Sequence, residues 1–151
     1  MSAPNHQALF EHSPWVEQRA DARASSGDRH ADLMAVVAEA TDEERLALIR
    51  AHPELAGKTA IDRTLTDASA AEQASAGLDR LTPEEFARFN DLNAAYRTRF
   101  RFPFIICVRL TDKAGILAAM ERRLANDRDT EIATAIAEIG KITALRLKDM
   151  Q

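Results

Sequence analysis

The stretch from Asp129 to Lys148, DTEIATAIAEIGKITALRLK, decides the fold class. Its large apolar residues recur three or four positions apart, and this spacing places them on one face of an α-helix. They are Ile132, Ile136, Ile139, Ile142 and Leu145. The same spacing prevails in most of the chain, where alanine and leucine are frequent and five residues are glycine. The sequence therefore predicts an all-α protein.

Capping signals predict where the other helices begin. Thr41 and Thr82 are each followed three positions later by a glutamate, an arrangement in which side chains and backbone cap one another. Ser69 repeats this spacing, and Ser13 stands before Pro14, a residue suited to the first helical turn. The expected helices run from Pro14 to about Ser25, Asp28 to about Ala40, Thr41 to Ile49, Ser69 to about Gly77, Thr82 to about Phe100, Lys113 to Asn126 and Asp129 to Lys148.

One short segment does not follow the helical spacing. Residues 102–108, FPFIICV, are apolar and rich in β-branched side chains, as in a strand. The chain contains no second segment of this kind to pair with it, so a sheet is not expected. The segment is either a lone extended stretch or a buried turn into the next helix.

Length and charge set broad limits on the kind of protein. A chain of 151 residues fits a single domain, which we expect to span residues 1–151. Twenty basic and 24 acidic side chains give a formal charge of −4, which argues against binding to nucleic acid. No apolar run approaches the roughly 20 residues that cross a bilayer, and residues 1–10 lack the pattern of a signal peptide. We therefore expect a cytoplasmic protein that binds neither nucleic acid nor membrane.

The sequence carries no signature of a metal or cofactor site. Its single cysteine, Cys107, excludes an internal disulfide and a cysteine-built zinc site. The motifs HExxH, GxSxG, GxGxxG and the P-loop are absent, and His6, His12 and His30 have no partners at metal-ligand spacing. We therefore expect neither a metal ion nor a cofactor.

Three polar residues are candidates for chemistry, and each also has a purely structural interpretation. His52, which stands before Pro53 at a predicted helix end, could face a pocket as an acid–base group or bind terminal carbonyls. Glu72 could form a capping box with Ser69, or lie beside backbone donors that bind an anionic ligand. Arg146 could stabilise the end of the last helix, or hold a carboxylate or ureido carbonyl in its guanidinium fork.

Arginines and aromatic residues alternate between positions 97 and 109. The set comprises Arg97, Arg99, Arg101 and Arg109 with Phe100, Phe102 and Phe104. Such alternation occurs on surfaces that bind single-stranded nucleic acid. Solvated arginines around buried aromatic rings produce the same pattern, and the negative net charge favours this second interpretation.

Several short motifs occur in an order that is typical of one enzyme family. They are Ser13-Pro14-Trp15, HPELAGK at 52–58, SAAEQ at 69–73, AGL at 76–78, FNDLN at 89–93, Tyr96, the segment 100–108, EIGKI at 138–142 and LRL at 145–147. In these motifs the chain resembles the 2-oxo-4-hydroxy-4-carboxy-5-ureidoimidazoline (OHCU) decarboxylases of urate breakdown. The resemblance covers residues 9–147, and the HPELAGK and SAAEQ blocks are its most specific part.

The resemblance implies an all-helical homodimer that decarboxylates a small ureidoimidazoline substrate to (S)-allantoin without a cofactor. It makes His52 an acid–base catalyst and Glu72 the catalytic residue that orients His52. It further implies that Arg146 and Gln73 hold the ureido and ring oxygens and that backbone groups of residues 104–108 meet the substrate. The substrate-binding residues implied are Pro53, Ser69, Gln73, Phe104, Ile105, Ile106, Cys107, Val108 and Arg146.

Two other functions compete with this interpretation. A helical interaction module would use His52, Glu72 and Arg146 only as helix caps and surface charges, with no cavity joining them. A nucleic-acid-binding protein would use the arginines between 97 and 109, and its affinity would fall with salt. The enzyme interpretation predicts instead that His52, Glu72 and Arg146 meet in one cavity.

Overall fold

All regular structure in the described residues is helical, which confirms the predicted fold class. The computed structural model describes residues 9–10, 13–56 and 67–150. Its α-helices are α2 (Trp15–Asp21), α3 (Arg29–Glu39), α4 (Asp42–Arg50), α6 (Asp67–Ser75), α7 (Pro83–Phe100), α8 (Lys113–Arg123) and α9 (Arg128–Asp149), with a single 3-10 turn, η1 (Val108–Leu110). Gly57 and Lys58 of the HPELAGK motif lie outside these residues.

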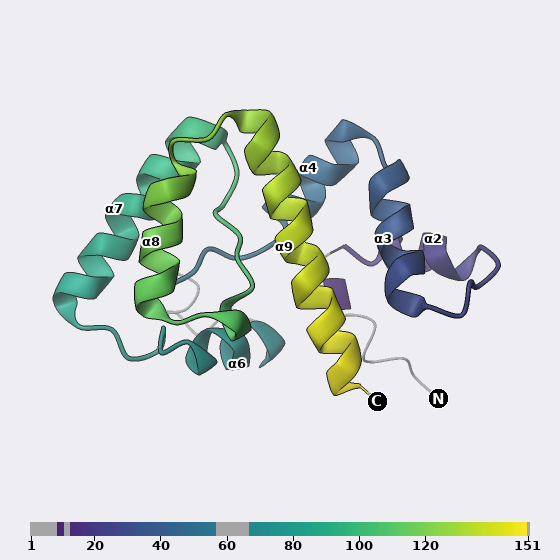
Figure 1. Ribbon diagram of the computed structural model, residues 1–151, viewed down its shortest axis with the longest axis horizontal. Coiled ribbons are helices and arrows are strands. Elements are labelled where there is room, and N and C mark those ends of the chain that lie inside the picture. The colour runs from purple at the N-terminus through teal and green to yellow at the C-terminus, as the bar shows by residue number, and fades with distance from the viewer. Residues whose placement is uncertain (1–8, 11–12, 57–66, 151) are drawn as a thin grey trace.

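Helix α9 runs between two groups of helices (Figure 1). On one side α7 packs against α8, and on the other side α3 and α4 pack against α9 while α2 packs against α3. The ring of His30 on α3 hydrogen-bonds the carbonyl oxygen of Gly140 on α9 at 2.9 Å. Helix α6 lies at the lower end of the molecule in this view, where it contacts η1. The lower half of α9 therefore lies close to both α6 and η1.

Two of the predicted capping boxes are confirmed and one is wrong. Thr41 and Thr82 each accept a hydrogen bond from the backbone of the glutamate three residues later, whose carboxylate binds back. Ser69 does not cap, because α6 begins at Asp67 and already contains it. The first helix is also shorter than predicted, since it ends at Asp21 and takes Pro14 as its N-cap residue without a side-chain cap.

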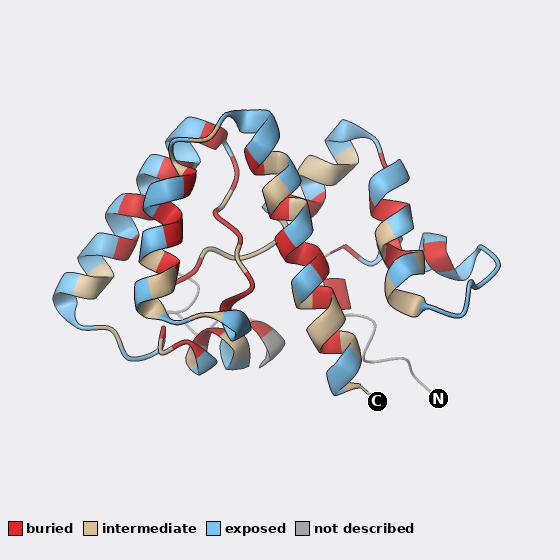
Figure 2. Cartoon of the chain, viewed as in Figure 1, coloured by how far each residue is buried: buried red, intermediate tan, exposed pale blue. Residues whose placement is uncertain are grey.

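The segment 102–108 forms no strand and runs as an extended stretch between α8 and α9 into η1 (Figure 1). Its aromatic side chains are buried with Tyr96 of α7. The Tyr96 ring centroid lies 4.6 Å from that of Phe100, 5.9 Å from that of Phe102 and 5.3 Å from that of Phe104. Figure 2 shows buried residues along this stretch and along the inner faces of α8 and α9. The aromatic cluster thus fixes the stretch inside the molecule.

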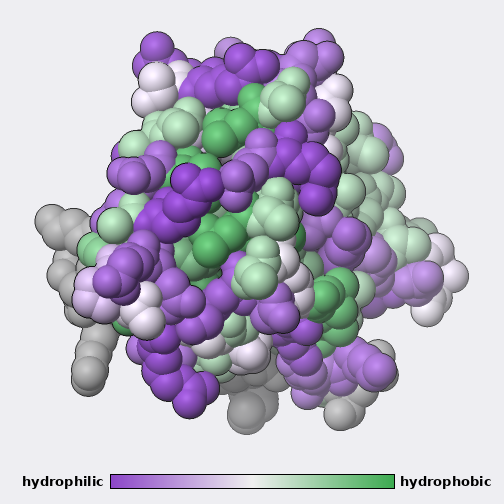
Figure 3. Space-filling model, turned by 60° about the vertical axis from the view of Figure 1, so that its left-hand side comes forward, coloured by the Kyte–Doolittle hydropathy of each residue, from purple (hydrophilic) through white to green (hydrophobic). Residues whose placement is uncertain are grey.

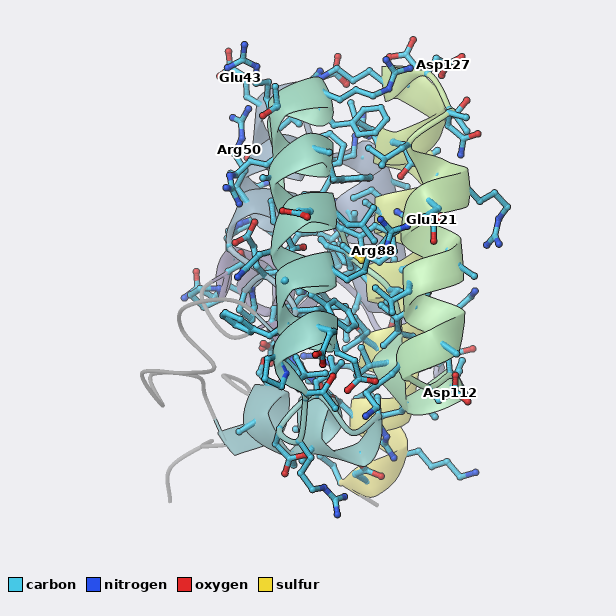
Figure 4. All side chains as sticks on the ribbon, turned by 90° about the vertical axis from the view of Figure 1, so that its left-hand side faces the viewer. Glu43, Arg50, Arg88, Asp112, Glu121 and Asp127 are labelled. Atoms are coloured by element: carbon cyan, nitrogen blue, oxygen red, sulfur yellow. The ribbon has the colours of Figure 1, made fainter. Side chains whose placement is uncertain are left out.

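The outer faces of α7 and α8 are polar. Figure 3 shows hydrophilic side chains over most of this side of the molecule, with hydrophobic residues in small areas between them. Arg88 of α7 and Glu121 of α8 form an exposed ion pair of 2.9 Å across the two helices (Figure 4). None of the helices in the described part of the chain is long and apolar enough to span a membrane.

The buried aromatic rings decide the interpretation of residues 97–109. Phe100, Phe102 and Phe104 are each 1% exposed, so they offer no stacking surface for a base. Arg97 forms an ion pair with Glu54, and Arg99 donates to the carbonyl oxygen of Asn126 at 2.7 Å. The structure therefore supports the interpretation in which arginines surround buried aromatic rings, and not the interpretation as a nucleic-acid-binding surface.

Candidate active site

His52 lies just beyond the end of α4 and its ring orientation is set by a backbone bond. The Nδ1 atom is 2.9 Å from the carbonyl oxygen of Leu48, one turn back. Because a carbonyl only accepts, Nδ1 carries the hydrogen, and the neutral ring has its lone pair on Nε2. Pro53 follows and prevents the helix from continuing through this position. The local sequence thus presents a half-buried imidazole with a defined tautomer.

Glu72 on α6 and Arg146 on α9 form a two-bonded ion pair. Arg146 donates through Nε to Oε2 of Glu72 at 2.8 Å and through Nη2 to Oε1 at 2.6 Å. The Arg146 side chain is 5% exposed and that of Glu72 is 13% exposed. Parallel bonds of this kind are among the strongest that a guanidinium makes. Glu72, which we expected to orient His52, thus also binds Arg146, 74 residues further along the sequence.

Gln73, the neighbour of Glu72, points to a different element. Its buried side chain accepts a hydrogen bond from the backbone nitrogen of Ala56 at 3.0 Å and donates to the carbonyl oxygen of Glu54 at 3.4 Å. Ala56 has a positive φ of 53°, an uncommon conformation for a residue with a side chain. The amide therefore holds the backbone that follows His52, and α6 positions two parts of the site at once.

Side chains of α8 and α9 hold the backbone of the extended stretch 102–108 by hydrogen bonds. Arg123 of α8 donates from Nη1 to the carbonyl oxygen of Ile105 at 2.7 Å. Glu138 of α9 accepts from the backbone nitrogen of Cys107 at 2.8 Å. Burial raises the pKa of the Cys107 thiol, which keeps it protonated at neutral pH. The stretch is thus a fixed wall with an unreactive thiol.

One cavity joins these residues. Its empty volume is about 460 Å³, counting the open solvent at its mouth. The lining residues are His52, Pro53, Leu55, Ser69, Glu72, Gln73, Phe104, Ile105, Ile106, Cys107, Val108, Arg109, Ile142 and Arg146. Every candidate site residue named from the sequence is in this set. The interaction-module interpretation, in which no cavity joins His52, Glu72 and Arg146, does not match this geometry.

Sequence reasoning missed three of the lining residues. Leu55 belongs to a quoted motif and Ile142 to the apolar face of the last helix, so neither carried a signal of its own. Arg109 was assigned to the set of solvated arginines, although it follows the wall residues directly in sequence. Within the described residues, no group of three or more histidine, cysteine or acidic side chains could hold a metal ion.

Comparison with known proteins identifies the family. The sequence profile described as OHCU decarboxylase matches residues 5–148. The chain belongs to the OHCU decarboxylase family. The 2-oxo-4-hydroxy-4-carboxy-5-ureidoimidazoline decarboxylase of Haloferax volcanii is 42% identical over 144 residues, which are 93% of this chain and 83% of that protein. The corresponding protein of Halalkalicoccus jeotgali is 42% identical over 145 residues, 94% of this chain and 80% of that protein.

Solved structures agree with this assignment. A crystal structure of (S)-allantoin synthase matches with a TM-score of 0.70 and 28% identity, over 97% of this chain and 48% of that one. A crystal structure of OHCU decarboxylase in the presence of (S)-allantoin matches with a TM-score of 0.74 over 99% of this chain and 98% of that one. The second is 19% identical, so its likeness concerns the fold alone.

Proposed function

We propose that this protein decarboxylates 2-oxo-4-hydroxy-4-carboxy-5-ureidoimidazoline to (S)-allantoin in urate degradation. The observation that carries the proposal is the meeting of His52, Glu72 and Arg146 in one cavity of a chain that belongs to the OHCU decarboxylase family. These residues come from the end of α4, from α6 and from α9. A cavity that holds an imidazole beside a carboxylate–guanidinium pair offers both proton transfer and recognition of ureido and ring oxygens.

The substrate itself supplies the electron sink. When the bond from C4 to the carboxylate breaks and CO2 leaves, the electron pair passes into the conjugated ring toward its nitrogen and carbonyl groups. A proton then adds to C5, the carbon that bears the ureido group, and the C4 hydroxyl gives up its proton to become the ring carbonyl of the product. This balance needs no external electron acceptor such as pyridoxal phosphate or thiamin.

His52 is the acid–base residue in this proposal. Its Nδ1 is bound to the Leu48 carbonyl, so Nε2 is the atom that exchanges a proton with the substrate at or beside the C4 hydroxyl. The Glu72–Arg146 pair and Gln73 position the ureido and ring oxygens. A single enantiomer results when the planar intermediate is protonated on one face, which depends on positioning more than on acid strength.

The wall contributes backbone groups. Ile105 and Cys107 bind Arg123 and Glu138 through their backbones. In an extended chain, successive residues direct their backbone groups to opposite sides. The N–H and C=O of Ile106 between them are therefore the groups we assign to the substrate.

The test uses substrate generated in situ from urate with urate oxidase and the upstream hydrolase. Circular dichroism then follows the formation of one allantoin enantiomer. We expect His52→Ala to abolish turnover and His30→Ala to preserve it. His30 is a matched control because its ring also bonds a backbone carbonyl at 2.9 Å but does not line the cavity. Near-normal turnover by His52→Ala, or racemic product at the buffer rate with the wild type, would refute the proposal.

The proposal extends to assembly and location. We propose that the chain acts as a homodimer in the cytoplasm and that residues 1–151 form a single domain. The family resemblance supports the dimer, and sedimentation velocity tests it.

A further inference from the structure

Arg109 differs from the rest of the cavity lining. It is exposed, whereas all other lining residues are buried or half-buried, so it stands at the cavity mouth. Its guanidinium binds the Asp149 carboxylate with Nη1–Oδ2 and Nη2–Oδ1 distances of 2.6 and 3.2 Å. Asp149 is the last residue of α9, its side chain is 58% exposed, and it does not line the cavity. Arg109 therefore spans the boundary between the cavity and the surface.

The charges in the cavity make Arg109 important for an anionic ligand. Inside, Glu72 and Arg146 neutralise one another through their paired bonds. Arg109 is the lining cation whose partner lies outside the lining. A ligand that carries a carboxylate brings a full negative charge at neutral pH. A guanidinium fork matches a carboxylate in geometry and charge, and in this structure the Arg109 fork already holds one.

The charge of Glu72 acts on Arg109 as well. The hydrogen bond that Arg109 donates to Asp149 is the main cause that raises the pKa of Arg109, and the charge of Glu72 raises it further. Arg109 thus remains positively charged at neutral pH.

We propose that Arg109 binds the carboxylate of the substrate at the cavity mouth, in exchange for Asp149. The inference rests on the proposed function, whose substrate bears one carboxylate. It assigns a substrate-binding residue beyond the set implied by the family resemblance. Because the carboxylate leaves as neutral CO2, this contact weakens as the reaction proceeds, so it supports binding more than the chemical step.

The test compares Arg109→Gln with Asp149→Asn, which remove opposite ends of the same ion pair. We expect Arg109→Gln to raise KM about tenfold with kcat unchanged or higher, a loss of one charge-assisted contact. Asp149→Asn frees the guanidinium and should leave KM unchanged or lower it. Arg109→Lys keeps the charge but not the guanidinium fork, so its KM should lie between those of the wild type and Arg109→Gln.

A second measurement uses (S)-allantoin, which has lost the carboxylate. Its inhibition constant should be the same for Arg109→Gln and the wild type. If the ion pair had only a structural role, Arg109→Gln and Asp149→Asn would change KM by the same factor. Both substitutions would then also weaken inhibition by allantoin. That result would overturn the assignment of Arg109. A wild-type protein that is inactive on the substrate would overturn the proposed function and this inference together. An active wild type whose KM is unchanged by Arg109→Gln would overturn this inference alone.

Discussion

Replacing Arg123 by Met should destabilise the protein and disturb the cavity wall at once. The Arg123 side chain is 6% exposed, and its Nε donates to Oε1 of Glu131, which is fully buried, at 2.8 Å. Tyr96 donates to the same carboxylate oxygen, and the guanidinium lies 4.3 Å from the ring centroid of Phe104. Methionine keeps most of the aliphatic stem, so the change removes mainly the charge and its hydrogen bonds.

The magnitude follows from what the substitution leaves behind. Glu131 would be a buried carboxylate without its cation, and breaking a buried pair in this way costs about 3–5 kcal/mol. The Ile105 carbonyl loses its donor as well. We expect the free energy of unfolding to fall by about 4 kcal/mol and Tm by about 8–16 °C in a domain of this size. We also expect a lower kcat/KM, because the Ile105 backbone is part of the wall.

Urea unfolding and the allantoin assay measure the two effects, with two further variants as references. Arg122→Met removes the exposed neighbouring arginine and should change stability by no more than about 0.5 kcal/mol. The double variant Arg123→Met/Glu131→Gln removes the stranded charge and should recover about 1–3 kcal/mol relative to Arg123→Met. Equal losses from Arg122→Met and Arg123→Met, or a double variant less stable than Arg123→Met, would refute the reasoning.

Three further predictions concern single side chains. Burial raises the pKa of Glu17 from 4.5 to about 7, so the free energy of unfolding should fall as the pH rises through this interval. Glu17→Gln should remove that loss, roughly 3 kcal/mol at most, in urea unfolding at pH 8, whereas the exposed control Glu43→Gln should not. Cys107→Ala should keep activity within a few-fold, and iodoacetamide should not inactivate the wild type at pH 7; rapid inactivation would contradict a neutral, buried thiol. Arg146→Lys should lower kcat/KM at least tenfold with unchanged helical circular dichroism, because lysine cannot form the paired bonds to Glu72; wild-type activity would show that the fork is dispensable.

The helices could be predicted because their signals are local. The capping boxes at Thr41 and Thr82 and the isoleucine spacing of the last helix depend on residues within a few positions of one another. Errors arose where a local pattern has two uses. Ser69 and Glu72 have the spacing of a capping box, but the helix begins at Asp67 and the glutamate binds a distant arginine.

The residues of the candidate site could be predicted from motifs, but the hydrogen bonds and ion pairs among them could not. The pairing of Glu72 with Arg146 and of Gln73 with the Ala56 backbone depends on how α6 docks, and no spacing in the sequence encodes that geometry. Arg109 was missed for a related reason, since a charged residue after an apolar stretch has the pattern of a surface residue. Its place at the cavity mouth follows only from the path of the stretch between α8 and α9.

The Glu72–Arg146 pair also constrains how descendants of this protein can change. A mutation in either codon alone strands a charge in the interior, and the two codons are 74 positions apart, so no single mutational event replaces both. We expect each one-step intermediate that loses one of the two charges to be less active than its parent. Lineages that retain the fold should therefore keep both charges or exchange both residues, and an inherited variant in which only one of the two charges is removed should have lost the activity.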